Sequence, residues 1–358
     1  MRTIGIIGTA KNTGKTTTLS FLIKGLLNNE IRLAVTSIGY DGEEIDNITL
    51  LQKPRLYFEK NTIVATSEKC LKNCEANFEF ISGTSLVTPL GKVIIVRITK
   101  PGMIVLAGPN RAAALKEVIN LIKERAGCDV LLVDGSLNRL SPMMYLDKLI
   151  FTTGASRNVD VKILASEMLL IEKVFSFPLT KHKNRIFDYD NSVILKKGNG
   201  DAETIYPSCD LNNLHSLASC ITQDAAALYI PALLSVREFG EIIEIIKERI
   251  GDNKLELIIK SPIMLLLSGE FSLILLILER MQLAGVELTY LQKPELSAIT
   301  INPFYPKIDN YHYVKSYVDK EAFRREMDSV LTTPVYNIKE IGSEGPNEIF
   351  KQIFRTSV

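Results

Sequence analysis

The first forty residues alternate between apolar runs and one polar loop rich in small residues. Apolar positions fill Thr3–Gly8, recur at helical spacing over Leu19–Leu27, and fill a second run at Leu33–Ile38. A polar loop, residues 8–18, separates the first run from the helical pattern. This order predicts strand, loop, helix and strand, which is the opening of a parallel α/β sheet.

Beyond residue 50 the pattern changes and then returns to the α/β alternation. Short β-prone runs at 55–59, 62–66 and 93–98 indicate a β-rich insertion over about 50–98. Strands are then expected at 103–107, 129–133 and 146–152, and helices at 111–125 and 160–170. We therefore place a first domain at 1–178 with the insertion inside it.

The rest of the chain predicts a connector and a second unit. Residues 179–228 mix short strands with polar turns and indicate an irregular connector. Residues 229–358 predict a C-terminal α/β domain, with helices at 235–250 and 271–284 and strands at 255–259, 286–291 and 298–301. The expected fold class is α/β: a parallel sheet flanked by helices, with a β-rich insertion and a second, C-terminal α/β unit.

Composition narrows the classes of partner. The 358 residues are 46% hydrophobic and 23% charged, and 42 Lys and Arg balance 41 Asp and Glu, for a net charge of +1. A globular chain with this balance has no electrostatic surplus for nucleic acid or an anionic membrane. The most apolar stretch, 262–278, is interrupted by Ser268, Gly269 and Glu270, so we expect a buried helix and no membrane span.

Cysteine usage indicates a reducing compartment. Five cysteines are an odd number, and the N-terminus does not resemble a secretory signal, so free thiols and a cytoplasmic location are expected. Cys70 and Cys74 are spaced C-x3-C, but no second Cys or His pair lies nearby. Two ordinary thiols are favoured over a zinc site, although the spacing alone leaves metal binding open.

The polar loop carries the clearest chemistry. Gly14-Lys15-Thr16 ends a loop that follows a predicted strand and opens a predicted helix, the context in which such a tripeptide binds phosphate. A chance glycine turn is the alternative, and the flanking elements with three consecutive threonines argue against it. The expected nucleotide-binding residues are Gly8, Thr9, Lys11, Asn12, Thr13, Gly14, Lys15, Thr16 and Thr17.

Acidic residues at strand ends supply the expected partners of a magnesium ion. Asp134 follows four apolar residues, and Asp41 follows the second strand. We assign Thr16, Asp41 and Asp134 as Mg²⁺ ligands and Lys15, Asp41 and Asp134 as catalytic residues. An ordinary buried strand with a turn aspartate is the alternative at Asp134, and a turn-forming aspartate before Gly42 is the alternative at Asp41.

The string Gly8-Thr9-x4-Gly14-Lys15-Thr16 resembles the phosphate loop of dethiobiotin synthetases and of cobyrinic and cobyric acid synthases, members of the SIMIBI class of P-loop proteins. The resemblance covers residues 1–45, with weaker support over 100–175, and implies ATP and Mg²⁺ as ligands. It explains why the two glycines lie one residue further apart than in G-x4-G-K-[ST]. MinD-type relatives form homodimers through a lysine five residues before the second one, whereas Lys11 precedes Lys15 by four, which puts that role in doubt. No Gly-x-Cys-x-Gly elbow for a glutaminase is present.

The layout of the whole chain also resembles a subunit of the ATP-dependent reactivating factors that accompany adenosylcobalamin-dependent lysine 5,6-aminomutase. That resemblance implies an accessory ATPase, stimulated by a partner protein such as the aminomutase or a second reactivase subunit. The alternative is a synthetase of the dethiobiotin type, in which Arg111 and Arg157 would clamp a small carboxylate; surface ion pairing is the ordinary role for both. A third alternative is a binding module with an inactive nucleotide site, which the intact Gly14-Lys15-Thr16 disfavours. Guanine-reading strings such as Asn-Lys-x-Asp are absent, which favours ATP.

Overall fold

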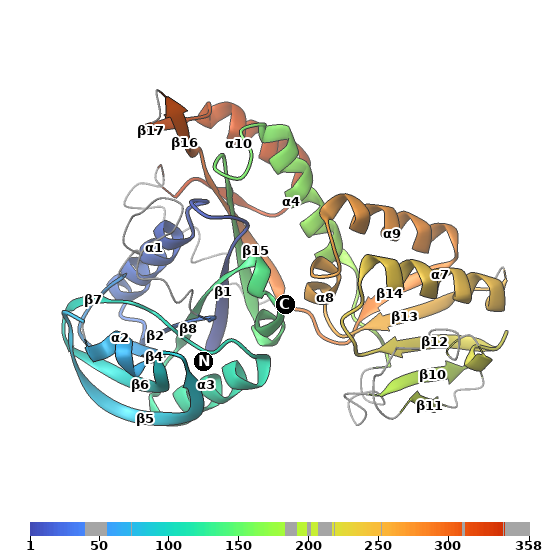
Figure 1. Cartoon of the computed structure of the whole chain (residues 1–358), viewed down its shortest axis with the longest axis horizontal. Helices are drawn as coiled ribbons and strands as arrows, with labels where there is room; N and C mark the ends of the chain where they lie inside the picture. The colour runs from blue at the N-terminus through green and yellow to red at the C-terminus, as the bar shows by residue number, and fades with distance from the viewer. Residues whose placement is uncertain are drawn as a thin grey trace. The chain divides into compact units, whose positions relative to one another are not determined.

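The computed structural model describes residues 1–39, 56–72, 74–182, 192–198, 202–206, 217, 219–251, 253–309, 312–338 and 340. The chain divides into two compact units: unit 1 is Met1–Ser166 with Pro294–Val358, and unit 2 is Glu167–Lys293 (Figure 1). The expected boundaries at 178 and 228 differ from this division. The second α/β unit is inserted within the first, and the last segment of the chain returns to unit 1.

The strands of unit 1 are β1 (Arg2–Gly8), β2 (Leu33–Ser37), β3 (Leu56–Phe58), β4 (Ile63–Ser67), β5 (Asn77–Thr88), β6 (Gly91–Lys100), β7 (Gly102–Ile104), β8 (Val130–Ser136), β9 (Lys148–Gly154), β15 (Glu295–Asn302), β16 (Phe304–Asp309), β17 (His312–Tyr317) and β18 (Val335–Tyr336). Its helices are α1 (Lys15–Asn28), α2 (Glu68–Lys72), α3 (Ala112–Arg125) and α10 (Lys320–Val330), with short 3-10 turns η1 (Leu137–Arg139) and η2 (Ser141–Tyr145). Helix α4 (Val161–Ser176) begins in unit 1 and continues into unit 2.

Nine of the described strands form one sheet, in the order β18-β15-β9-β1-β8-β2-β4-β6-β5. Neighbours from β18 to β4 are parallel, and β6 and β5 are added antiparallel. The expected α/β class is confirmed, and the β-rich insertion extends the same sheet. Strand β5 was not expected because half of its residues are exposed and its buried positions show no clean alternation. The strand expected at 103–107 is shorter: β7 lies outside the large sheet and pairs with β3.

Helix α1 covers one face of this sheet. Its buried side chains include Leu19, Leu22 and Leu26, which pack in one cluster with Ile4 and Ile6 of β1. Each such side chain contributes about 1.5–3 kcal/mol when it is fully buried. This packing fixes the first turn of α1 at the carboxyl edge of β1, which is the edge where parallel sheets bind ligands.

Strand β15 enters the sheet directly after unit 2. The ammonium group of buried Lys148, at the start of β9, contacts Glu295 Oε1 at 2.7 Å. From there the two strands run parallel until Asn302 pairs with Gly154. The expected strand at 298–301 therefore exists but belongs to unit 1, because its apolar residues complete the first core.

Unit 2 has its own sheet, in the order β11-β10-β12-β13-β14. Its strands are β10 (Val193–Lys197), β11 (Ala202–Tyr206), β12 (Ala225–Ile230), β13 (Leu255–Ile259) and β14 (Val286–Tyr290), and its further helices are α7 (Val236–Ile250), α8 (Pro262–Leu266) and α9 (Phe271–Leu283). Strands β12 to β14 are parallel, and β10 is antiparallel to both of its neighbours. Helix α7 starts at a capping box of Ser235 and Glu238 and buries one apolar face.

Helix α9 differs from the fully buried helix that its sequence predicts. Ile274, Ile277 and Met281 are buried, whereas Leu273 and Leu283 on its other face are exposed. Among the helices within the described ranges, none is long and apolar enough to cross a membrane.

Each unit offers one glycine-to-alanine substitution, and the two should change the free energy of unfolding in opposite directions. A Cβ at Gly108 would overlap the carbonyl oxygen of Ser37, whereas a Cβ at Gly240, inside α7, meets its nearest atom, Arg280 Nη1, at 3.6 Å. Gly108→Ala should lower the free energy of unfolding by about 3 kcal/mol through the overlap. Gly240→Ala should raise it by about 0.5–1 kcal/mol through helix propensity. Urea unfolding of both variants checks the pair, and equal effects would contradict the described packing.

Candidate functional site

The loop between β1 and α1 has a backbone shape that small residues permit. Gly14 caps α1 at φ 96°, and Asn12 adopts φ 62°. Asparagine tolerates this left-handed region better than most residues, and glycine adopts it without cost. A Cβ at Gly14 would also lie only 3.2 Å from the Cβ of Asn302, so both backbone angle and space require glycine there.

Four consecutive carbonyl groups of the loop accept hydrogen bonds from side chains around it. Arg157 Nη1 donates to the Thr9 oxygen at 3.0 Å, and Thr13 Oγ1 donates to the Ala10 oxygen at 2.9 Å. Ser156 Oγ donates to the Lys11 oxygen at 2.9 Å, and Asn302 Nδ2 donates to the Asn12 oxygen at 2.8 Å. We call these donors, Arg157, Thr13, Ser156 and Asn302, the carbonyl collar.

The carbonyl collar decides where the loop amides point. In a trans peptide the N–H lies opposite the C=O, so carbonyls held by the collar turn the N–H groups of the same peptides away from it. The amides of Asn12, Thr13 and Gly14 make no hydrogen bond to a described residue. Amides of this kind at the N-terminus of a helix are suited to an anion, because their partial positive charges reinforce the helix dipole.

Lys15 and Asp134 meet beside the loop. Lys15 Nζ lies 2.8 Å from Asp134 Oδ2, and both side chains are partly buried. Within the described structure, Asp134 Oδ1 is buried and has no hydrogen-bond partner. Burial raises the pKa of the Asp134 carboxyl group, and the neighbouring Lys15 ammonium opposes that rise. A buried carboxylate oxygen without a partner is costly, so this geometry favours a cation or a proton donor at Oδ1.

Asp134 and Thr16 carry the types of oxygen donor that suit a magnesium ion. Thr16 lies in the first turn of α1, is partly buried, and its hydroxyl makes no hydrogen bond to a described residue. A carboxylate and a hydroxyl are hard oxygen ligands, the kind that Mg²⁺ takes together with phosphate oxygens and water. Asp41, the third expected ligand, lies outside the described residues.

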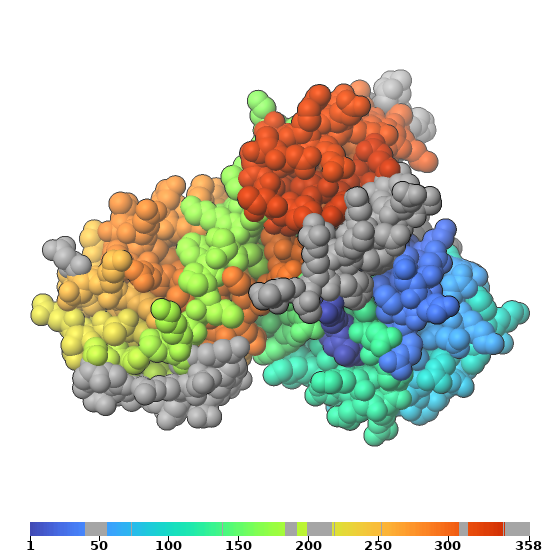
Figure 2. Space-filling view, turned by 180° about the vertical axis from the view of Figure 1, so that it is seen from behind, coloured from blue at the N-terminus to red at the C-terminus, as the bar shows by residue number. Residues whose placement is uncertain are grey.

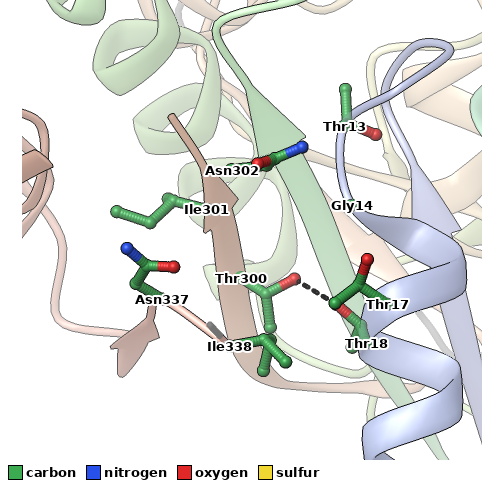
Figure 3. Close-up of a pocket in the computed structure, with 9 residues that line it drawn as sticks. All are labelled: Thr13, Gly14, Thr17, Thr18, Thr300, Ile301, Asn302, Asn337 and Ile338. Carbon is green, nitrogen blue, oxygen red and sulfur yellow. Dashed lines mark hydrogen bonds between the residues drawn. The ribbon is translucent and has the colours of Figure 1, made fainter. Parts of the chain in front are cut away.

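A small hollow adjoins the loop on the side of β15 (Figure 3). It is lined by Thr13, Gly14, Thr17, Thr18, Thr300, Ile301, Asn302, Asn337 and Ile338. Thr18 Oγ1 and Thr300 Oγ1 are 3.0 Å apart, and this hydrogen bond joins α1 to β15 across the hollow's floor. The lining of the hollow thus combines apolar side chains with the side-chain amides of Asn302 and Asn337.

The two arginines expected to clamp a substrate have different surroundings. Arg157 belongs to the carbonyl collar, where it holds the Thr9 carbonyl. Arg111 is exposed and immediately precedes α3. Lys11 contributes its carbonyl to the collar and has an exposed side chain.

The cysteine pair shows no sign of a metal centre among the described residues. Burial raises the thiol pKa of both Cys70 and Cys74, which favours the protonated thiol over the metal-binding thiolate. No group of three or more His, Cys, Asp or Glu side chains suited to a metal ion occurs in the described ranges.

Sequence reasoning missed several residues that shape the site. Asn302 and Ser156 hold the loop, yet they lie 290 and 145 residues from the carbonyls they bind. In the sequence, each was only a polar residue just past a predicted strand. This weak feature indicates a contact with the loop only once the order of the strands in the sheet is known. Arg139 was also missed; a Cβ at Gly39, which has φ 68°, would lie 2.7 Å from its Nη1.

Comparisons with known proteins add little. No family model matches the chain, and no curated protein matches it. Among solved structures, the chain is similar to pNOB8 ParA bound to nonspecific DNA, at 12% identity and a TM-score of 0.23. The match covers 47% of this chain and 58% of that one, so this chain spans little more than half the neighbour's length.

Two aspartates near β8 should respond to pH with opposite signs. The pKa of buried Asp134 is raised, so its ionisation disfavours the folded state. This cost is absent below the pKa of the unfolded chain, near 3.8, and is incurred as the pH rises through the pKa of the folded protein. Asp134→Asn should therefore gain stability relative to wild type from about pH 4 upwards. Arg32 lowers the pKa of the exposed Asp129 carboxyl group. The stability that this interaction contributes is therefore present above the pKa of the unfolded chain and is lost on acidification.

Urea unfolding at several pH values between 3 and 8 measures both effects. Asp129→Asn serves as the matched control and should lose a little stability near neutral pH and none in acid. If the two differences from wild type follow pH in the same direction, the environment assigned to Asp134 is wrong.

Proposed function

We propose that this chain binds ATP with Mg²⁺ at the β1–α1 loop and hydrolyses it as a P-loop ATPase. The observation that carries the proposal is the carbonyl collar, which engages four consecutive carbonyls of the loop that leads into α1. We infer that the amides of these peptides face an anion bound at the start of the helix. An anion-binding loop, a lysine and a buried carboxylate in one place suit phosphoryl chemistry, whose catalysis consists mainly of positioning and charge stabilisation.

Each group has a role in this chemistry. Lys15, whose ammonium group contacts Asp134, would bind the β- and γ-phosphates. Asp134 would then hold the metal, directly or through a water molecule, and the Thr16 hydroxyl would complete its protein ligands. Mg²⁺, when bound, neutralises charge that develops on the phosphate oxygens. We retain Asp41 as a candidate for metal binding or for orienting the attacking water.

The choice of nucleotide rests on the sequence, because both ends of the Asn302 side-chain amide beside the loop are already engaged, one by the Asn12 carbonyl and the other by the Phe304 amide. Since guanine-reading strings are absent from the sequence, we propose ATP over GTP.

We further propose that the ATPase acts on a partner protein. A whole α/β unit of this chain lies outside the loop's unit, and its described part has no group of metal-ligating side chains. The sequence resemblance to reactivating factors makes adenosylcobalamin-dependent lysine 5,6-aminomutase the first partner to test. A synthetase is less favoured, because Arg157 is engaged with the loop and Arg111 is exposed before α3.

Lys15→Ala tests the site directly. In wild type, Mg-ATP at a hundred times its dissociation constant should add about 2.7 kcal/mol to the stability of unit 1. That corresponds to a rise of about 5–10 °C in its melting temperature. The rise should disappear in Lys15→Ala, since the charge that contacts the phosphates is gone, and GTP should give a smaller rise than ATP.

Lys24→Ala is the matched control, because Lys24 is exposed on the same helix two turns further on. It should keep the full rise with Mg-ATP. If no nucleotide raises the melting temperature of wild type, the proposal is refuted. Turnover separates the two enzyme classes: an accessory ATPase should hydrolyse ATP slowly until the aminomutase is added, whereas a synthetase should turn over with a small carboxylate alone.

A further inference from the structure

Asn302 makes contacts in three directions at the end of β15. Its Nδ2 donates to the Asn12 carbonyl of the phosphate-binding loop at 2.8 Å, and its own carbonyl accepts from Ala155 N at 2.9 Å. Its Oδ1 accepts from Phe304 N at 3.3 Å. One side chain therefore joins the loop to the first residue of β16, while its backbone is held by the turn after β9.

The segment that follows Asn302 is a closed two-stranded hairpin. β16 and β17 pair antiparallel from Phe304 with Tyr317 to Asp309 with His312. The rings of Phe304 and Tyr317 meet edge to face, with centroids 5.8 Å apart. Val318 N donates to the Pro303 carbonyl at 3.0 Å, which closes the base of the hairpin.

The base of the hairpin is tied to the loop, whereas its strands face outward. Val314 is 44% exposed and Tyr317 is 52% exposed. Helix α10 follows the hairpin, and this part of the chain forms a continuous surface, red in Figure 2. A change in the position of Asn302 would therefore be transmitted to an accessible element and not lost in the core.

We propose that Asn302 is a positioning residue that couples the conformation of the phosphate-binding loop to the β16–β17 hairpin. The side-chain amide of Asn302 cannot move without changing its hydrogen bond to the Asn12 carbonyl or its hydrogen bond from the Phe304 amide. Filling the loop with an anion orders the peptide between Asn12 and Thr13, because the N–H of that peptide faces the anion. The hairpin is thus the surface whose exposure reports occupancy of the loop, and the element that a partner would read. The nucleotide-dependent part of this inference rests on the proposed function; the coupling in the nucleotide-free protein does not.

Strand β15 itself supplies a control. Thr300, two residues before Asn302, bonds to Thr18 of helix α1 and makes no described contact with the loop carbonyls or the hairpin. Thr300→Val removes a buried hydrogen bond of similar length while keeping the side chain's size. It should change the stability of unit 1 without uncoupling loop from hairpin.

Amide hydrogen exchange of the full chain tests the coupling in the absence of nucleotide. Asn302→Ala should speed exchange about three- to tenfold both at the amide of Thr9, the loop amide that is bonded to Thr152, because the loop is held less firmly, and at the amide of Phe304, because it loses its acceptor. Asn302→Asp keeps the acceptor for Phe304 but loses the donor to Asn12, so it should speed exchange in the loop alone. Thr300→Val should leave both segments close to wild type. If Asn302→Ala affects one segment and not the other, the coupling is refuted whether or not the protein binds ATP.

A second arm adds saturating Mg-ADP. Wild type should show slower exchange in the loop and in the hairpin, and Asn302→Asp should show it in the loop alone. Slower exchange in the wild-type loop without any change in the hairpin would overturn the inference and leave the proposed function standing. No change in the loop would count against the proposed function, and the nucleotide-free arm would still decide the coupling.

Discussion

The orientation of four peptide groups is the constraint on which this site depends. A loop of small residues has no core of its own, and its carbonyls would otherwise compete with its amides for the inward-facing position. The carbonyl collar removes that competition by engaging every carbonyl from Thr9 to Asn12. If the proposed function holds, the peptide groups of the loop are already held in place before the ligand arrives, so little reorganisation is needed on binding.

The collar in turn depends on strand order. Gly8 pairs with Thr152 of β9, and β9 pairs with β15 up to Asn302. Because parallel strands end at one edge, the turn after β9 and the end of β15 reach the loop from the same side. The ion pair of buried Lys148 and exposed Glu295 lies at the opposite end of these two strands, where the two residues face each other in the register of β9 and β15. An ion pair far from the loop thus helps to place Asn302 beside Asn12.

The sequence predicted the parts of the fold that local patterns encode. The opening strand, loop and helix, the strand ending at Asp134, and most elements of unit 2 follow from periodicity and flanking polar residues. The pairing of β15 with β9 could not be predicted, because a short strand such as the one expected at 298–301 fits either sheet. The same limit applies to the site. Lys15 and Asp134 lie in local patterns that can be recognised in the sequence, whereas the role of Asn302 depends on its contact with Asn12, 290 residues away. Arg157 was predicted near the ligand for its charge, but its position gives it a hydrogen bond to the loop backbone.

The insertion of unit 2 between β9 and β15 has a consequence for biosynthesis. A ribosome releases the chain in order, so β1, the loop, β8 and β9 emerge well before Asn302, with all of unit 2 made in between. During that interval the loop has Thr13, Ser156 and Arg157 available but lacks its fourth donor, and the sheet ends at an open β9 edge. Closing a contact across about 150 residues is slow compared with local pairing. The nascent first unit therefore passes through a stage in which the edge of β9 can accept a foreign strand, and translation past residue 302 ends that exposure.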